Sequence, residues 1–179
     1  MTRKSVFRDP DLCVDCKACL IACKVKHMSP PYPTSPAVSE PRGLNLIHVY
    51  QFGPVIDGAG VNQSFVTIAC MHCEDAPCLR VCPTSAIYKD TPTHITMVNR
   101  DKCIGCKACL WICPYGAPSF DEDGKLALCD LCIDRLREGK KAACEATCQA
   151  MAIFIGSPEE IAELRAKKAV DRIGRGLME

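Results

Sequence analysis

Sixteen cysteines, arranged in four groups of four, constrain this chain more strongly than any other feature of its sequence. In chain order the groups are Cys13, Cys16, Cys19 and Cys23; Cys70, Cys73, Cys78 and Cys82; Cys103, Cys106, Cys109 and Cys113; and Cys129, Cys132, Cys144 and Cys148. Aromatic residues make up only 6% of the chain, so few large side chains are available to fill a core. Small domains with thin cores usually depend on disulfides or bound metal. We therefore expect the cysteines to stabilise the fold in one of these two ways.

The expected cellular compartment favours bound metal over disulfides. The first seven residues contain two basic side chains and no apolar stretch, so we expect no secretory signal and a cytoplasmic location, with export beside a twin-arginine partner left open. Dense cysteines in a reducing compartment usually bind metal. Residues 43–56, an uncharged stretch, are too few and too polar to span a bilayer. A net charge of +1 without a basic run predicts no nucleic-acid partner.

Groups one and three share the spacing Cys-x2-Cys-x2-Cys-x3-Cys, which is typical of bacterial ferredoxins. A tight loop can wrap three corners of a cubane cluster, whereas the fourth corner faces away and needs a ligand from a distant segment. In two-cluster ferredoxins the fourth cysteine of each run therefore binds the other cluster of the pair. We expect each fourth cysteine to open a short helix and to point toward a neighbouring cluster.

Groups two and four are variants of this run. Group two has a longer gap before Cys78, and group four contains an inserted segment, 133–143. Asp11–Cys23 aligns without gaps on Asp101–Cys113, and an Ala-Ile pair stands at the same offset after the last cysteine of groups two and four. Such internal repetition predicts duplicated units.

Zinc and disulfides account for the cysteines less well. Structural zinc sites usually use two Cys-x2-Cys pairs, which is not the spacing of the triplets in groups one and three. A disulfide scaffold conflicts with the expected compartment. We therefore predict iron–sulfur clusters. A structural or maturation protein, whose metal only stabilises the fold, remains the opposing hypothesis.

The segment between groups one and two predicts an insertion. Residues 29–41 contain five prolines and should form an extended loop. Leu44–Phe52 and Ser64–Ala69 should be the strands of a hairpin, joined by Gly53–Gly60.

The last residues, 157–179, predict a helix. Ser157 is a good N-cap, Pro158 suits the first helical position, and Glu160 completes a capping box. We expect the apolar stripe of this helix to pack against its own domain more readily than against a partner. The stripe consists of Ala162, Ala166, Ala169, Val170 and Ile173.

Smaller features give further predictions. His94–Val98 should pair as a strand with Ala86–Tyr88. His72, between two cysteines, should be a packing residue, with a hydrogen bond that tunes a cluster as the alternative. Trp111, the single tryptophan, should also pack. The remaining histidines have no partner at ligand spacing, so we expect none of them to bind metal.

The segment Cys70–Cys78, with the sequence CMHCEDAPC, adds a resemblance to a known family. Together with the four cysteine groups and the hairpin insertion, it resembles the four-cluster iron–sulfur subunits of the dimethyl-sulfoxide-reductase type. Similar subunits serve formate dehydrogenases and tungsten aldehyde oxidoreductases. The resemblance extends over roughly residues 5–155.

This resemblance implies an α+β fold in which two pseudo-symmetric ferredoxin-like halves are interleaved in one unit, with a β-hairpin insertion and a C-terminal helix. One half would be residues 1–28 plus 121–156, and the other would be 64–120. Residues 29–63 would be the Pro-rich loop and the start of the hairpin insertion, and 157–179 the helical tail.

The resemblance also implies the ligands of four 4Fe–4S clusters. Cluster one would take Cys13, Cys16, Cys19 and Cys148; cluster two Cys70, Cys73, Cys78 and Cys113; cluster three Cys103, Cys106, Cys109 and Cys82; and cluster four Cys129, Cys132, Cys144 and Cys23.

In the family these clusters conduct electrons between subunits. The resemblance thus implies a non-catalytic electron-transfer subunit, and nothing in the sequence provides a nucleophile–base motif or a phosphate-binding loop. Its partners would be a large molybdenum- or tungsten-pterin catalytic subunit, of the aldehyde oxidoreductase or formate dehydrogenase type, and a flavin, quinone-linked or hydrogenase subunit. The alternative is a free, diffusible polyferredoxin. Nothing in the sequence supports self-association.

Overall fold

The computed structural model describes residues 3–27, 45–58 and 60–176, and the predicted Pro-rich loop at 29–41 lies outside these ranges. The mixed helix and strand content confirms the α+β class. The helices are α1 (Ala18–His27), α2 (Pro77–Val81), α3 (Ala108–Ile112), α4 (Ile133–Arg137), α5 (Ala143–Thr147) and α6 (Pro158–Gly176). The strands are β1 (Ser5–Arg8), β2 (Ile47–Asp57), β3 (Gly60–Ala69), β4 (Ile87–Lys89), β5 (Thr96–Val98), β6 (Ser119–Phe120), β7 (Leu126–Ala127) and β8 (Ile153–Gly156).

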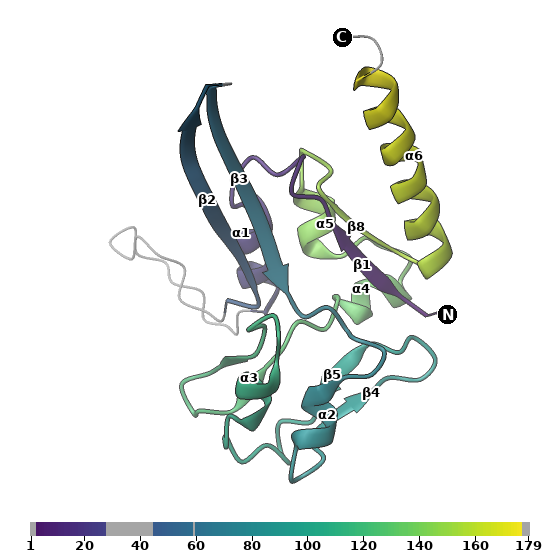
Figure 1. Ribbon diagram of the computed structural model, residues 1–179. Helices are drawn as coiled ribbons and strands as arrows, with labels where there is room; N and C mark the ends of the chain where they lie inside the picture. The colour runs from purple at the N-terminus through teal and green to yellow at the C-terminus, as the bar shows by residue number, and fades with distance from the viewer. Residues whose placement is uncertain (1–2, 28–44, 59, 177–179) are drawn as a thin grey trace.

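Short antiparallel strand pairs bring distant segments together. β1 pairs with β8 from Ser5↔Gly156 to Arg8↔Ile153, which places the start of the chain beside the segment that follows group four. Helix α1 packs against α5, and α2 packs against α3. We call these two packed units the α1–α5 assembly and the α2–α3 assembly. Figure 1 shows the α1–α5 assembly above the α2–α3 assembly, with Ala69–Cys73 passing between them. The β1–β8 pair was not predicted, because four residues are too few to reveal a period in the sequence.

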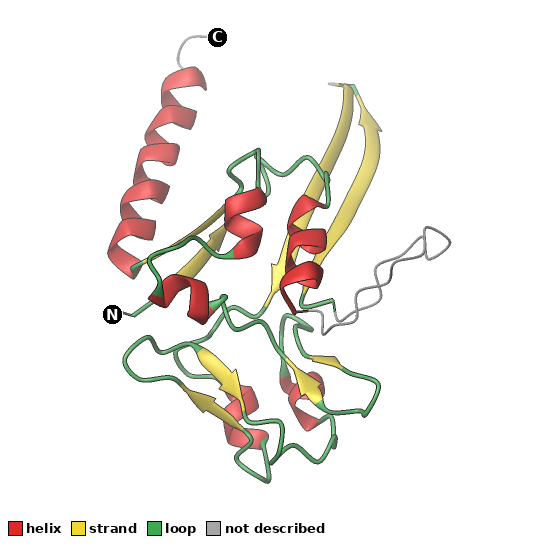
Figure 2. Cartoon of the chain, turned by 180° about the vertical axis from the view of Figure 1, so that it is seen from behind, coloured by secondary structure: helices red, strands yellow, loops and turns green. Residues whose placement is uncertain are grey.

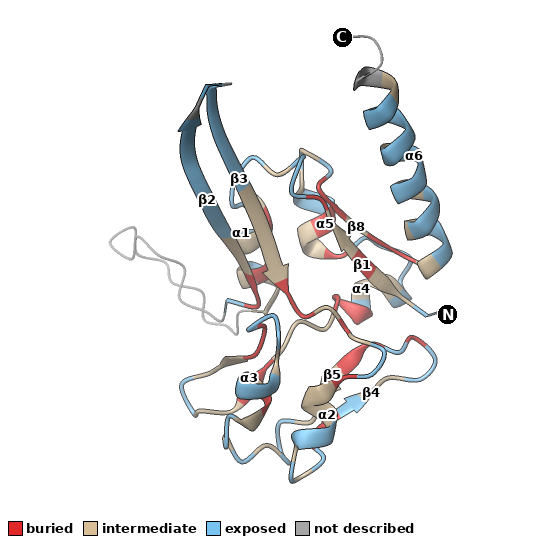
Figure 3. Cartoon of the chain, in the orientation of Figure 1, coloured by how far each residue is buried: buried red, intermediate tan, exposed pale blue. Residues whose placement is uncertain are grey.

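The predicted hairpin is present and is longer than expected. β2 and β3 pair from Ile47↔Ala69 to Asp57↔Gly60, so both strands extend into the segment predicted as their connection. The register shifts between Phe52 and Val55, around Pro54. Proline lacks a backbone N–H and is tolerated in strands at such irregularities. Only the base of the hairpin is buried, while its distal part projects with both faces exposed (Figure 3).

The predicted pairing of Ala86–Tyr88 with His94–Val98 is confirmed, with shorter strands. β4 and β5 pair from Ile87↔Val98 to Lys89↔Thr96. Lys89 then anchors the neighbouring cysteine loop, because its ammonium donates to the carbonyls of His72 (3.2 Å) and Cys73 and to the Thr96 hydroxyl (3.0 Å).

Helix α6 begins as predicted and packs through a different face. The Ser157 hydroxyl accepts the Glu160 N–H (3.2 Å), and the Glu160 carboxylate accepts the Ser157 N–H (2.6 Å), which completes the capping box. The predicted stripe is exposed, with Val170 at 67% and Ile173 at 64%, so that prediction was wrong.

The half-buried positions of α6 include Ile161, Leu164 and Lys168. Electrostatic contacts dock this face, because Lys168 pairs with the buried Asp9 and its ammonium lies 5.5 Å from the centre of the Phe7 ring. The helix therefore runs along β1 and β8 and then away from the body of the protein (Figure 2).

The repeated cysteine loops share an unusual backbone conformation. Asp15 and Lys17 have φ of 53° and 57°, and their counterparts Gly105 and Lys107 have φ of 69° and 62°. Left-handed residues at two places in each loop let it curl tightly around its centre. Gly105 also meets a steric constraint, since a Cβ there would lie 2.7 Å from the carbonyl oxygen of Gly124.

The prediction that each fourth cysteine opens a helix was wrong. The third cysteines Cys78, Cys109 and Cys144 lie within α2, α3 and α5, and the fourth cysteines Cys82, Cys113 and Cys148 end these helices. In group one both Cys19 and Cys23 lie inside α1. Each single-turn helix closes with an N–H bond from the fourth cysteine to the carbonyl three residues earlier, after which the extended cap directs the chain away.

Substitution of Gly105 by alanine should disrupt the loop of group three, because it adds both a clash with Gly124 and a strained φ. We expect the G105A protein to lose iron from this site, measured as iron per polypeptide after anaerobic purification. Gly139 has a similar φ of 73° with nothing within 4 Å of its virtual Cβ, so G139A is the matched control. Equal iron in all three proteins would contradict the steric argument.

Candidate metal centres

Three hollows in the structure are lined by cysteines from two groups each. One is lined by Cys13, Cys16, Cys19 and Cys148, here named the first set. Another is lined by the second set, Cys70, Cys73, Cys78 and Cys113, with Cys109 also at its wall. The third is lined by the third set, Cys82, Cys103, Cys106 and Cys109. Each hollow thus combines a cysteine loop with a thiol from another segment of the chain.

The four remaining cysteines, Cys23, Cys129, Cys132 and Cys144, are also neighbours and are named the fourth set. Burial is the main cause that raises the pKa of Cys23, followed by charge repulsion from the other three members of the set. Helix α1 supplies Cys23 and α5 supplies Cys144, and these two helices pack together. The linings of the hollows and these electrostatic contacts place every cysteine near members of one of four sets, with Cys109 next to both the second and the third.

Without metal, the buried thiols hold their protons. Burial, followed by neighbouring thiols, raises the pKa of Cys144 to about 12. Burial also raises the pKa of Cys70 to about 12, although the N–H of His72 opposes it. Because metal ligation deprotonates a thiol, a bound cation would displace these protons and offset the repulsion among the sulfurs. Such sets are unfavourable when empty and favourable around a multivalent metal centre.

Backbone N–H groups point at several of the sulfurs. The N–H of Ala86 donates to Cys82 Sγ and that of Ala152 to Cys148 Sγ, both at 3.3 Å. This explains the repeated Ala-Ile pair in the sequence, since the same turn follows both cysteines. For Cys82, burial raises the thiol pKa, but hydrogen bonds from Thr84 and Ala86 outweigh it and lower the pKa. Donors of this kind stabilise thiolate ligands and set cluster potentials.

The donor chemistry and the ligand spacing fit iron–sulfur clusters. Thiolates are soft ligands that suit zinc and iron–sulfur clusters. Structural zinc sites usually take two Cys-x2-Cys pairs. The second set instead combines Cys70, Cys73 and Cys78 from one loop with Cys113 from another segment. The remaining wall of its hollow is mostly apolar and includes Ala76, Pro77, Ile87, Ala117 and Leu126.

The sets differ in their access to solvent. Cys16 and Cys106 are the only exposed cysteines, and they occupy equivalent positions in the two repeated loops. Trp111, predicted to pack, is 88% exposed and lies one residue before the end of α3. That prediction was wrong, because the face of α3 that carries Trp111 has no covering element in the described part of the chain.

The sequence did not reveal the contacts of two histidines. His27, predicted to have no partner at ligand spacing, places its Nε2 3.5 Å from a carboxylate oxygen of Asp130. His27, Asp130 and Cys132 present ligand atoms within 4.8 Å of one another.

His72 is 6% exposed, and burial is the main cause that lowers its pKa to about 3, followed by Arg8 and Lys89. These contacts join segments that are far apart in sequence, so no local motif predicts them.

Among the described residues, no helix is both long enough and apolar enough to cross a bilayer. Even α6, the longest of these helices with 19 residues, carries charged residues along its length.

Comparison with known proteins places this sequence in a family. Residues 61–158 match the model of the 4Fe–4S dicluster domain. The sequence is 36% identical to a subunit of the sulfite dehydrogenase of Allochromatium vinosum, over 87% of this chain and 69% of that protein. It is 37% identical to a component of the anaerobic dimethyl sulfoxide reductase of Escherichia coli, over 89% of this chain and 76% of that protein.

A third relative is the formate dehydrogenase iron-sulfur subunit of Wolinella succinogenes, which is 30% identical over 95% of this chain and 89% of that protein. These similarities confirm the resemblance to iron–sulfur subunits of the dimethyl-sulfoxide-reductase type, and with it the binding of multiple 4Fe–4S clusters. The protein belongs to the 4Fe–4S dicluster family of oxidoreductase subunits.

Proposed function

We propose that this chain carries four 4Fe–4S clusters and conducts electrons between a large molybdenum- or tungsten-pterin catalytic subunit and a second redox partner. The observation that supports the proposal is that cysteines from two groups line each of three hollows and that Cys23 lies near Cys129, Cys132 and Cys144. The clusters supply reversible one-electron chemistry, and the chain supplies ligands, hydrogen bonds and spacing.

The proposed ligands of the four clusters are the four sets. The lining of the hollows supports the first three, and mutual repulsion of the thiols supports the fourth. Cys109 faces two hollows, and we assign it to the third set because its own loop provides Cys103 and Cys106. Each set then takes three thiols from one group and one from another group, which is the exchange that ferredoxin runs use.

We further propose that the chain consists of two ferredoxin-like halves. The packing of α1 on α5 and the β1–β8 pair support residues 1–28 plus 121–156 as one half. The packing of α2 on α3 and the β4–β5 pair support 64–120 as the other. The hairpin crosses the proposed boundary, since β3 begins at Gly60, and 29–63 and 157–179 would be additions to this framework.

Electrons would enter and leave at the two exposed cysteines. Cys16 lies beside Val14, which is 66% exposed, and Cys106 lies beside Ile104, which is 67% exposed. With the exposed Trp111, these apolar side chains give both ends of the series of clusters the composition of an interface core. We propose that the catalytic subunit docks at one end and the second redox partner at the other.

The relatives favour a bound subunit over a free polyferredoxin, because their names describe components of oxidoreductases. In this proposal the chain itself catalyses no bond change, and its work is in the cytoplasm. The formate dehydrogenase relative supports a formate dehydrogenase type of catalytic subunit, with an aldehyde oxidoreductase type as the other candidate.

Anaerobic purification from the native host tests the number of clusters and the partner together. We expect about sixteen irons and as much acid-labile sulfide per chain, with coupled signals from reduced clusters in low-temperature EPR. A large pterin-containing protein should copurify. Tightly bound zinc without a reducible signal would overturn the electron-transfer proposal, and a purely monomeric, fully loaded protein would favour the polyferredoxin.

Double substitutions test the ligand sets by iron counting. Cys16→Ala/Cys148→Ala removes two ligands of the same proposed set, so it should lose the iron of one cluster. Cys132→Ala/Cys148→Ala removes ligands of two sets and should lose about twice as much iron. If each group bound its own cluster, this second pair would instead lose the iron of only one cluster.

A further inference from the structure

Two buried side-chain nitrogens in the described part of the chain have no hydrogen-bond partner. They are Nε of Arg8 and Nε2 of His72. A buried donor without an acceptor is destabilising, so such groups are rare in folded proteins and need a physical explanation. Neither group belongs to the sixteen thiols already assigned.

His72 is oriented by the backbone around it. Its Nδ1 accepts the N–H of Thr96 at 3.0 Å, so in the neutral ring the proton is on Nε2, which becomes a donor. Its own N–H donates to Cys70 Sγ at 3.4 Å, and its carbonyl is fixed by Lys89. The ring is therefore held in place within the loop of the second set, with one N–H left over.

Arg8 reaches the same region from the end of β1. Its Nη1 donates to the thioether of Met71 at 3.2 Å, which is a weak acceptor for a guanidinium. Burial raises the pKa of Cys129 and Cys144 in the fourth set, and the charge of Arg8 opposes this rise in both. Burial lowers the pKa of the His72 ring, and Arg8 adds to this effect. Arg8 thus lies within electrostatic reach of both the fourth set and the loop of the second set.

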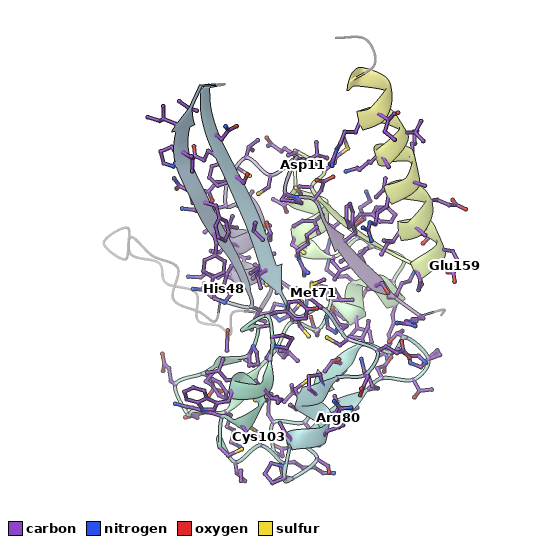
Figure 4. All side chains as sticks on the ribbon, viewed as in Figure 1. Asp11, His48, Met71, Arg80, Cys103 and Glu159 are labelled. Atoms are coloured by element: carbon purple, nitrogen blue, oxygen red, sulfur yellow. The ribbon has the colours of Figure 1, made fainter. Side chains whose placement is uncertain are left out.

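These contacts lie at the junction between the two assemblies of the fold. Met71, the residue that Arg8 contacts, lies midway between the upper part, marked by Asp11, and the lower part, marked by Cys103 and Arg80 (Figure 4). Cys70 and Cys129 also interact here, although they belong to the second and fourth sets. The second and fourth sets therefore approach each other at this junction.

We propose that Arg8 and His72 are tuning residues, whose unpartnered N–H groups raise the reduction potentials of the two clusters that flank the junction. Arg8 acts on the cluster of the fourth set, and His72 acts on the cluster of the second set. A reduced cluster carries one more negative charge than its oxidised form, so a cation or an N–H donor beside it stabilises the reduced form. This inference rests on the proposed ligand sets.

The test is an EPR-monitored redox titration of the intact, anaerobically purified protein and its variants. R8M removes the charge and the donor while it retains the apolar stem, and H72F removes the ring donor. We expect each to weaken reduction of one cluster by roughly tenfold or more, a downward shift of about 59 mV for a one-electron couple. R8K retains the charge and H72Q retains an N–H donor, so both should recover part of the shift.

Arg80 provides the matched control. Its side chain is 66% exposed and pairs with Asp75 beside the loop of the second set, so solvent and salt screen its charge. R80Q should leave all potentials close to those of the unmodified protein. Unchanged potentials in R8M and H72F at full iron content would overturn the tuning roles, whereas an iron content below four clusters in the unmodified protein would overturn the ligand sets instead.

A second measurement separates His72 from His27, whose ring lies within 4.8 Å of Cys132. In protein labelled with ¹⁵N-histidine, pulsed EPR of the reduced clusters should detect a coupled nitrogen that persists in H27Q and is lost in H72F, because His72 is the buried histidine of the cysteine loops. Absence of any such coupling would overturn the role of His72.

Discussion

Burial of closely spaced cysteine thiols, which opposes thiolates until a cationic centre binds them, is the constraint on which this structure depends. Each set gathers sulfurs from distant segments, such as Cys148 beside the loop of Cys13 and Cys16. The rest of the protein provides little else to bring them together, since the sheets are two-stranded pairs and α2 to α5 have five residues each. A metal centre that binds only the folded arrangement contributes its binding energy to folding. The clusters therefore stabilise the fold as well as carrying its redox chemistry.

The backbone accommodates these centres through a few repeated devices. Left-handed residues curl the loops, a single helical turn carries the third cysteine, and an extended cap at the fourth cysteine redirects the chain. Ser85 and Met151, three residues after Cys82 and Cys148, both have φ of 51°. The turn that they form presents an N–H to the preceding sulfur. The internal repeat in the sequence is thus a repeat of hydrogen-bond geometry.

The residues with a proposed function are exceptions to the usual burial of apolar side chains and pairing of buried donors. Ile104 is exposed beside the exposed Cys106, Trp111 is exposed on α3, and Arg8 and His72 leave buried donors unpartnered. Each of these features costs stability in an isolated chain, and each lies beside a proposed cluster or a proposed docking surface. Such exceptions are expected at functional sites, where they are offset elsewhere in the structure.

The sequence by itself determined the sixteen candidate ligands, the type of cluster and the start of α6, because each depends on local information. Spacing within a loop limits which metal centre the loop can wrap, and Ser157, Pro158 and Glu160 cap a helix whatever its surroundings. Only the tertiary structure decided which face of α6 packs, since ion pairs of Lys168 and Arg172 with Asp9 and Asp11 outweigh a weak alanine-rich stripe. It also decided that Arg8 lies near His72, because this proximity follows from the four-residue pairing of β1 with β8, and pairing between distant short strands leaves no periodic signal in the sequence.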